Sequence, residues 1–164
     1  MVSTENVKIL SLAYGGDAIG RLADGRVVFV PYAIPGELVR VKLVEEKVRH
    51  ARAELLEVLE FSPDRVPPRC THFTICGGCH YQHMNYPNQL NAKAGILREQ
   101  MERLGGFKDI PAIEMVPSPA PWYYRNHIQF HLTKEGSLGF HRARSNHPLA
   151  IQECHLPEAG INRL

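Results

Sequence analysis

The chain has 164 residues, 44% of them hydrophobic and 22% charged, which is an ordinary globular composition with room for one sizeable core or two small domains. Its formal net charge of +2 does not by itself indicate a nucleic-acid partner, so any basic surface must be local. No apolar run approaches the roughly 18 residues of a membrane span, and the first residues lack a signal-peptide pattern. We therefore expect a cytoplasmic protein without membrane association.

Residues 6–60 are predicted to form several short strands. The segment 26–30 is apolar and rich in β-branched residues, and the segment 39–43 alternates apolar and basic residues, as a half-buried strand does. Asp24-Gly25 and Pro35-Gly36 are strong turn signals, because glycine tolerates the positive φ that tight turns need. Short strands with turns about every ten residues predict a small β-barrel.

A glycine-rich segment at residues 15–20 invites comparison with nucleotide-binding loops. It matches neither the dinucleotide fingerprint nor the phosphate-loop pattern, and no helical pattern follows it. We interpret the segment as a bend or bulge between strands.

The clearest helix is predicted at residues 87–104. Pro87 suits a first helical turn, Gly105-Gly106 suits the stop, and the proline-rich stretch 61–69 before the helix reads as a linker. Apolar residues recur at spacings of three and four, which predicts a core-facing stripe. The stripe consists of Leu90, Ala94, Leu97, Met101 and Leu104.

The last third returns to strand patterns. Residues 125–133 alternate polar and apolar side chains, Glu135-Gly136 supplies a turn, and residues 138–142 can pair back as a hairpin. The fold class expected for the whole chain is mainly β with one clear α-helix (α+β). We expect a barrel domain at residues 1–61 and a second part at residues 62–164.

All four cysteines of the chain fit one metal centre. Cys70, Cys76 and Cys79 lie within ten residues, and 74 residues separate Cys79 from Cys154. Iron-sulfur clusters take four thiolates, commonly three from a tight run and one from a distant segment, so a 4Fe-4S cluster is the first interpretation. Gly77-Gly78 would let the backbone turn sharply between neighbouring ligands.

Other uses of these cysteines stay open. Structural zinc also takes four cysteines, and His72, His80 and His83 are spare ligands, although zinc sites usually pair two short knuckles. The string from Cys76 to His80 matches c-type haem attachment, which normally requires export. A thioredoxin-like redox pair would need a parallel-sheet context that the sequence lacks.

A polar cluster on and beside the predicted hairpin could bind RNA. Cations and amides bind phosphates and base edges, and the aromatic run 122–124 just before the cluster could stack on unpaired bases. A solvated strand face beside core aromatics would give the same pattern. No catalytic motif is found. The RNA-binding candidates are Arg125, Asn126, His127, Gln129, Arg142 and Arg144.

Taken together, the motifs of the chain resemble the amino-terminal part of the RNA uracil-5-methyltransferases of the RumA and TrmA type. Residues 7–60 are similar to a TRAM domain, a small RNA-binding β-barrel. The cysteine loop and helix are similar to that family's cluster loop, and the last third is similar to its central domain. The matching stretches are residues 14–21, 30–37, 70–79, 124–126, 129–130, 138–140 and 151–154, with Gln82, Tyr86, Gln89 and Lys93.

The resemblance implies a function that this chain would share with further sequence. The family's methyltransferase domain, with its S-adenosylmethionine pocket, nucleophilic cysteine and general base, follows the matched part. We therefore expect a truncated, RNA-binding and 4Fe-4S-binding portion of an S-adenosylmethionine-dependent RNA (uracil-5-)-methyltransferase, inactive alone. Its target would be RNA, more often ribosomal (23S) than transfer, and no protein partner is implied. The alternative is a standalone iron-sulfur or zinc RNA-binding module.

Overall fold

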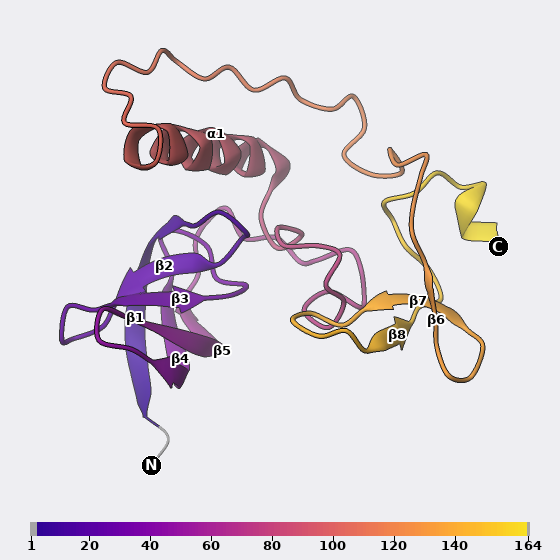
Figure 1. The fold of residues 1–164 in the computed structure, drawn as a ribbon, viewed down its shortest axis with the longest axis horizontal. Helices are drawn as coiled ribbons and strands as arrows, with labels where there is room; N and C mark the ends of the chain where they lie inside the picture. The colour runs from indigo at the N-terminus through magenta and orange to yellow at the C-terminus, as the bar shows by residue number, and fades with distance from the viewer. Residues whose placement is uncertain (1–2, 164) are drawn as a thin grey trace. The chain divides into compact units, whose positions relative to one another are not determined.

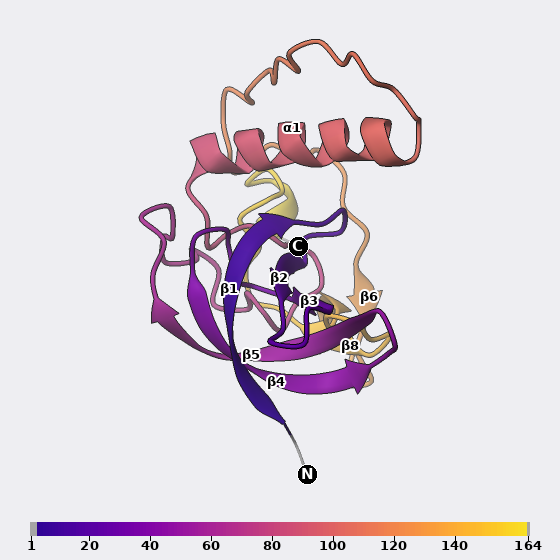
Figure 2. The ribbon, with the colours of Figure 1, turned by 90° about the vertical axis from the view of Figure 1, so that its left-hand side faces the viewer.

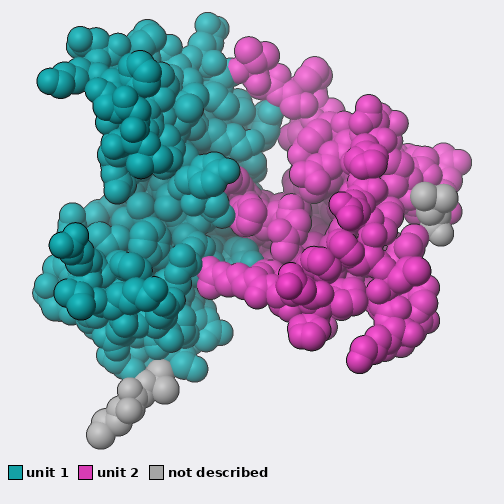
Figure 3. Space-filling view, viewed as in Figure 1, with its two compact units in different colours: residues 1–66, 83–115 teal, residues 67–82, 116–164 magenta. Residues whose placement is uncertain are grey.

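The computed structural model of the chain describes residues 3–163, which divide into two compact units (Figures 1 and 3). Unit 1 comprises Met1–Val66 and His83–Met115, and unit 2 comprises Pro67–Gln82 and Val116–Leu164. The predicted fold class is confirmed, because strands dominate and the described residues form one α-helix. That helix is not long and apolar enough to cross a membrane, and no other helix among the described residues is.

Unit 1 is built on a closed five-stranded barrel (Figure 2). Neighbouring strands follow the order β1-β2-β3-β5-β4, and all pairs are antiparallel except β3 with β5, which is parallel. The strands are β1 (Thr4–Leu12), β2 (Ala18–Arg21), β3 (Val27–Val30), β4 (Leu38–Glu46) and β5 (His50–Glu60).

The alternation seen in the sequence fills the barrel. Val7, Val39 and Val41 are fully buried or nearly so, while their strand neighbours face solvent. Both predicted turns are confirmed: Gly25 and Gly36 have φ of 87° and 90°. Branched side chains that point alternately inward thus make one continuous apolar core.

Strand β2 is one of the elements that the sequence did not predict; the others are two short elements of unit 2, a strand and a 3-10 helix. Residues 15–20 were read as a bend or bulge, but only the first part of the segment is a turn, and Ala18–Arg21 pairs with both β1 and β3. A Cβ at Gly20 would lie 2.3 Å from Val7 Cγ1 and 2.9 Å from the Lys8 carbonyl oxygen. Glycine is therefore needed here because two strands approach each other closely. Sequence patterns count glycine against a strand, so this use of the residue hides the strand from prediction.

Helix α1 (Tyr86–Arg103) confirms the predicted helix to within one residue at each end. Asn85 caps it by accepting a hydrogen bond from the Asn88 amide at 3.0 Å. The predicted core stripe is wrong in its burial, since no residue of the helix is buried and Leu97 is 47% exposed. The barrel closes its core without the helix. The helix instead contacts an extended segment of unit 1, since Arg98 donates hydrogen bonds to the carbonyls of Ile110 and Pro111.

Unit 2 contains a small antiparallel sheet of β6 (His131–Leu132), β7 (Leu138–His141) and β8 (Pro148–Ala150). The predicted turn at Glu135-Gly136 is confirmed, with φ of 79° at Gly136. The predicted strand at residues 125–133 is wrong over most of its length. Instead, Arg125 forms an isolated bridge to Pro157, so the backbone of this segment pairs with a loop rather than with β7. A short 3-10 helix, η1 (Ile161–Arg163), follows.

A buried ion pair fastens the middle of the linker, at Arg65, to the barrel. The Glu37 carboxylate is fully buried and accepts hydrogen bonds from Arg65 Nε and, at 2.8 Å, from Arg65 Nη2. The same carboxylate accepts the Ile34 amide at 3.0 Å, and Arg65 Nη2 also donates to the Tyr32 carbonyl at 2.9 Å. The carboxylate thus organises the loop between β3 and β4 as well as the linker.

His83 lies at the start of the second segment of unit 1 and is only 1% exposed. Its Nε2 atom lies 3.5 Å from the Ala33 carbonyl oxygen. Burial, followed by the positive charge of Arg65, lowers the pKa of His83 to about 4. The imidazole is therefore neutral in the folded protein at neutral pH, so His83 cannot act there as a cation that binds RNA phosphates.

This depressed pKa predicts an acid-sensitive unit 1. The unfolded chain binds a proton at His83 near pH 6.5, whereas the folded chain resists protonation until about pH 4. The stability that His83 contributes is therefore complete above pH 6.5 and is lost as the pH falls toward 4, by about 2 kcal/mol at pH 5. Urea unfolding at pH 7.5 and pH 5 measures this loss. We expect His83→Gln to reduce the difference between the two pH values, and an unchanged difference would contradict the assignment.

Candidate metal centre

The four cysteines all belong to unit 2, are half-buried, and form no disulfide. Three of them lie on the loop 70–79, which is folded by local backbone hydrogen bonds. The Phe73 amide donates to the Cys70 carbonyl at 3.1 Å, and the Cys76 amide donates to the His72 carbonyl at 2.8 Å. These turns bring three thiols that are near in sequence toward one side of the loop.

The loop is attached to the end of β7. The Gly77 amide donates to the His141 carbonyl at 2.9 Å, and the Ala143 amide donates to the Ile75 carbonyl at 2.8 Å. A Cβ at Gly77 would meet backbone atoms of residues 141–143 at 3.3 to 3.4 Å. Gly77 thus allows a close backbone approach, which is a different reason from the sharp turn that its sequence predicted.

Cys154 is held by Asn162 through both of its backbone polar groups. The Cys154 amide donates to Asn162 Oδ1 at 3.3 Å, and Asn162 Nδ2 donates to the Cys154 carbonyl at 2.8 Å. The following segment is paired with Arg125, whose amide donates to the Leu156 carbonyl at 2.9 Å. The distant cysteine is therefore positioned by residues that lie on both sides of it in sequence.

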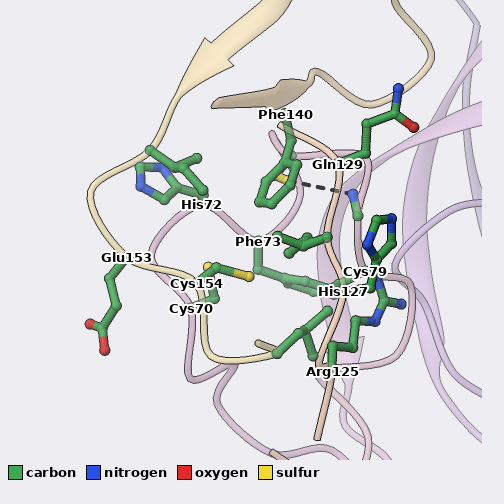
Figure 4. Close-up of a pocket in the computed structure, with 15 residues that line it drawn as sticks. Cys70, His72, Phe73, Cys79, Arg125, His127, Gln129, Phe140, Glu153 and Cys154 are labelled. Atoms are coloured by element: carbon green, nitrogen blue, oxygen red, sulfur yellow. Dashed lines mark hydrogen bonds between the residues drawn. The ribbon is translucent and has the colours of Figure 1, made fainter. Parts of the chain in front are cut away.

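All four thiols line one pocket of about 310 Å³ (Figure 4). Its remaining wall is largely apolar and includes Phe73 and Phe140. Three of the predicted RNA-binding residues, Arg125, His127 and Gln129, also line the pocket.

The electrostatics of the pocket disfavour bare thiolates. Burial raises the pKa of the thiols of Cys76, Cys79 and Cys154, and the neighbouring thiols raise each of these pKa values further. These directions agree with the four cysteines lining one pocket. A positively charged centre between the sulfur atoms would lower the cost of ionising them.

Four cysteines around one pocket are a donor set that an iron-sulfur cluster can use, with each thiolate bound to a different iron. Zinc would instead hold its thiolates at about 2.3 Å around one point. Among the spare zinc ligands, His72 also lines the pocket, whereas His83 is buried in unit 1. Within residues 3–163, no group of three Cys, His, Asp or Glu side chains is arranged to hold a single metal ion.

The remaining RNA-binding candidates are solvent-exposed. Asn126, Arg142 and Arg144 are all exposed, and Arg142 follows directly after β7. Arg125 is also exposed and places its guanidinium 5.9 Å from the centre of the Tyr124 ring, which is itself 51% exposed. The structure therefore places one of these cations, Arg125, beside an accessible aromatic ring on unit 2.

Sequence reasoning missed several supporting residues. Arg69 lies over the rings of Trp122 and Tyr123 at 5.6 and 5.3 Å, and Tyr123 Oη lies 3.0 Å from His155 Nδ1. These contacts join segments that are far apart in sequence, so no local sequence pattern predicts them. Gln82 appeared in the sequence only as part of the family resemblance, and Asn162 carried no signal, because the bonds of such amides to the cysteines are visible only in the folded chain.

Residues 2–56, which contain most of the barrel, match the TRAM domain family. Over nearly its whole length the chain is also homologous to the amino-terminal third of RNA methyltransferases. It is 40% identical over 153 residues to an uncharacterized RNA methyltransferase of Aquifex aeolicus. That alignment covers 93% of this chain and 36% of the relative. It is 35% identical over 165 residues to an uncharacterized RNA methyltransferase of Gloeobacter violaceus, and this alignment covers 98% of this chain and 36% of the relative.

A solved structure of a tRNA methyltransferase has a similar fold. The crystal structure of Pyrococcus abyssi tRNA (uracil-54, C5)-methyltransferase in complex with S-adenosyl-L-homocysteine is 28% identical and gives a TM-score of 0.62. The similarity covers 95% of this chain and 34% of that chain. The chain thus spans about a third of the length of the relatives it matches.

Proposed function

We propose that this chain is the RNA-binding and 4Fe-4S-binding amino-terminal portion of an S-adenosylmethionine-dependent RNA (uracil-5-)-methyltransferase. The observation that carries the proposal is the combination of homology to RNA methyltransferases with four thiols around one pocket. When bound, the cluster would supply a rigid covalent link between the loop 70–79 and Cys154. The chain's own residues would bind the RNA, and S-adenosylmethionine would bind outside the matched third.

The charge distribution supports placing the phosphate contacts on unit 2. Unit 2 contains six Lys and Arg but only three Asp and Glu, whereas unit 1 contains thirteen and fourteen. Several barrel cations are also neutralised by ion pairs, as in Arg40 with Glu57 at 2.9 Å and Arg26 with Glu46 at 2.8 Å. Phosphates are attracted by uncompensated cations, so unit 2 is the better anchor.

Two double variants test this function. Arg142→Ala with Arg144→Ala is expected to weaken RNA binding about tenfold or more and to reduce the slope of log affinity against log salt by about 1.5, because each phosphate contact contributes roughly 0.7 to 0.9. The matched control, Arg21→Ala with Arg49→Ala, removes the same charge from unit 1 and should change the slope less. Metal content should stay unchanged in both. Equal slopes for wild type and the Arg142/Arg144 variant would contradict the placement.

The RNA target is tested in the same assay. Ribosomal RNA is the proposed ligand from the sequence, and transfer RNA is its competitor because the solved relative acts on uracil-54 of tRNA. Tighter binding of a 23S ribosomal RNA fragment than of tRNA supports the ribosomal target, and the reverse order overturns it. The chain alone is expected to methylate neither RNA when S-adenosylmethionine is added, and turnover would contradict the proposed division of labour.

A further inference from the structure

Gln82 contacts two of the four cysteines at once. Its Oε1 atom accepts the Cys70 amide at 3.0 Å, and its Nε2 atom lies 3.2 Å from Cys79 Sγ. The side chain belongs to a residue that is only 9% exposed, although it does not line the thiol pocket itself. It thus lies behind the ligand loop and connects the loop's two ends.

The orientation of this amide follows from its partners. A backbone amide can only donate, so the group facing Cys70 N must be the carbonyl oxygen of Gln82. The NH₂ group is then the one that faces Cys79, and it donates a hydrogen bond to the sulfur. A buried amide whose oxygen and nitrogen are both engaged is held in one rotamer.

A hydrogen bond of this type changes the properties of a bound cluster. An N–H donor to a thiolate sulfur stabilises added negative charge, so it raises the reduction potential of the cluster and favours the thiolate over the thiol. Backbone amides also donate to these sulfurs: that of Gly78 lies 3.4 Å from Cys76 Sγ, and that of Leu156 donates to Cys154. A change of side chain does not remove such donors. Gln82 is therefore the side chain through which this tuning can be altered.

We propose that Gln82 is a positioning residue of the metal centre, which holds the 70–79 loop in its ligand conformation and raises the reduction potential through its bond to Cys79. This inference rests on the proposed cluster. It predicts that removing the donor makes the potential more negative and makes the cluster more easily lost to oxygen or chelator. A residue with a purely structural role would change cluster retention without moving the potential of the clusters that remain.

Three variants of the full chain separate the donor from the charge. Gln82→Met removes the donor without adding charge, and Gln82→Glu removes it and adds a negative charge. Gln129→Glu adds a negative charge at the thiol pocket without removing a bond to sulfur. Midpoint potential, iron content and sulfide content are measured for each variant after purification without oxygen. We expect Gln82→Met and Gln82→Glu to lower the potential of the clusters that remain, and Gln129→Glu to lower it less than Gln82→Glu does.

The outcomes distinguish this inference from the proposed function. Wild-type protein without iron and sulfide would overturn the proposed cluster, and the inference with it. A loaded wild type whose potential is unchanged in Gln82→Met, or shifted equally by Gln82→Glu and Gln129→Glu, would overturn only the role of Gln82.

Discussion

Cys79→Ser is expected to abolish metal binding, lowering iron from about four atoms per chain to near zero. Serine has a similar shape but is a poor ligand for iron, and Cys79 lies on the loop whose other thiols face the same pocket. Without the centre, nothing covalent joins this loop to the segment around Cys154. We therefore also expect residues 145–164 to be cleaved faster by protease.

His80→Asn is the matched control for this prediction. His80 is exposed, is adjacent to Cys79, and does not line the thiol pocket, so its replacement should leave iron, sulfide and protease resistance unchanged. Loss of iron from His80→Asn would mean that a histidine ligates the metal. Unchanged protease resistance in Cys79→Ser, with iron lost, would mean that Cys154 is not a ligand.

Glu37→Gln is expected to lower the free energy of unfolding of unit 1 by about 3 to 5 kcal/mol. The substitution keeps the shape of the side chain but leaves the Arg65 guanidinium, 19% exposed, without its buried counter-charge. It also replaces one of two oxygens that accept hydrogen bonds from Arg65 and Ile34. Urea unfolding followed by far-ultraviolet circular dichroism measures the loss.

A surface pair in the same barrel provides the comparison. Glu57→Gln removes a carboxylate that pairs with Arg40 at 2.9 Å, but both side chains are about half exposed, so the loss should stay below about 1 kcal/mol. Adding Arg65→Met to Glu37→Gln should recover part of the lost stability, because it removes the uncompensated charge. Equal losses for Glu37→Gln and Glu57→Gln would contradict the importance that we give to burial.

The sequence predicted best where one local pattern decides the structure. The alternation at residues 39–43 and the glycines of the two barrel turns were sufficient for β4 and the turns, and the 3.6-residue period was sufficient for α1. Strand β2 was missed because its decisive feature is a contact of Gly20 with Val7 on another strand. A local pattern contains no information about such a contact.

The same distinction applies to the candidate site. Cysteine spacing was enough to propose which residues form the centre, because three thiols within ten residues are already a strong signal. The contacts that position the cysteines depend on the folded chain. They are the attachment of the loop to β7 through Gly77, the hydrogen bonds of Asn162 to Cys154 and the hydrogen bonds of Gln82. Likewise, the apolar stripe of α1 predicts a helix correctly but does not predict how far its residues are buried.

Iron, acid-labile sulfide and zinc content of wild-type protein purified without oxygen test the central claim most directly. We predict about four irons and four sulfides per chain, with no zinc, because four thiols in one pocket would each bind a different iron of a 4Fe-4S cluster. One zinc per chain with no sulfide would contradict the cluster and leave a zinc-bearing module in its place.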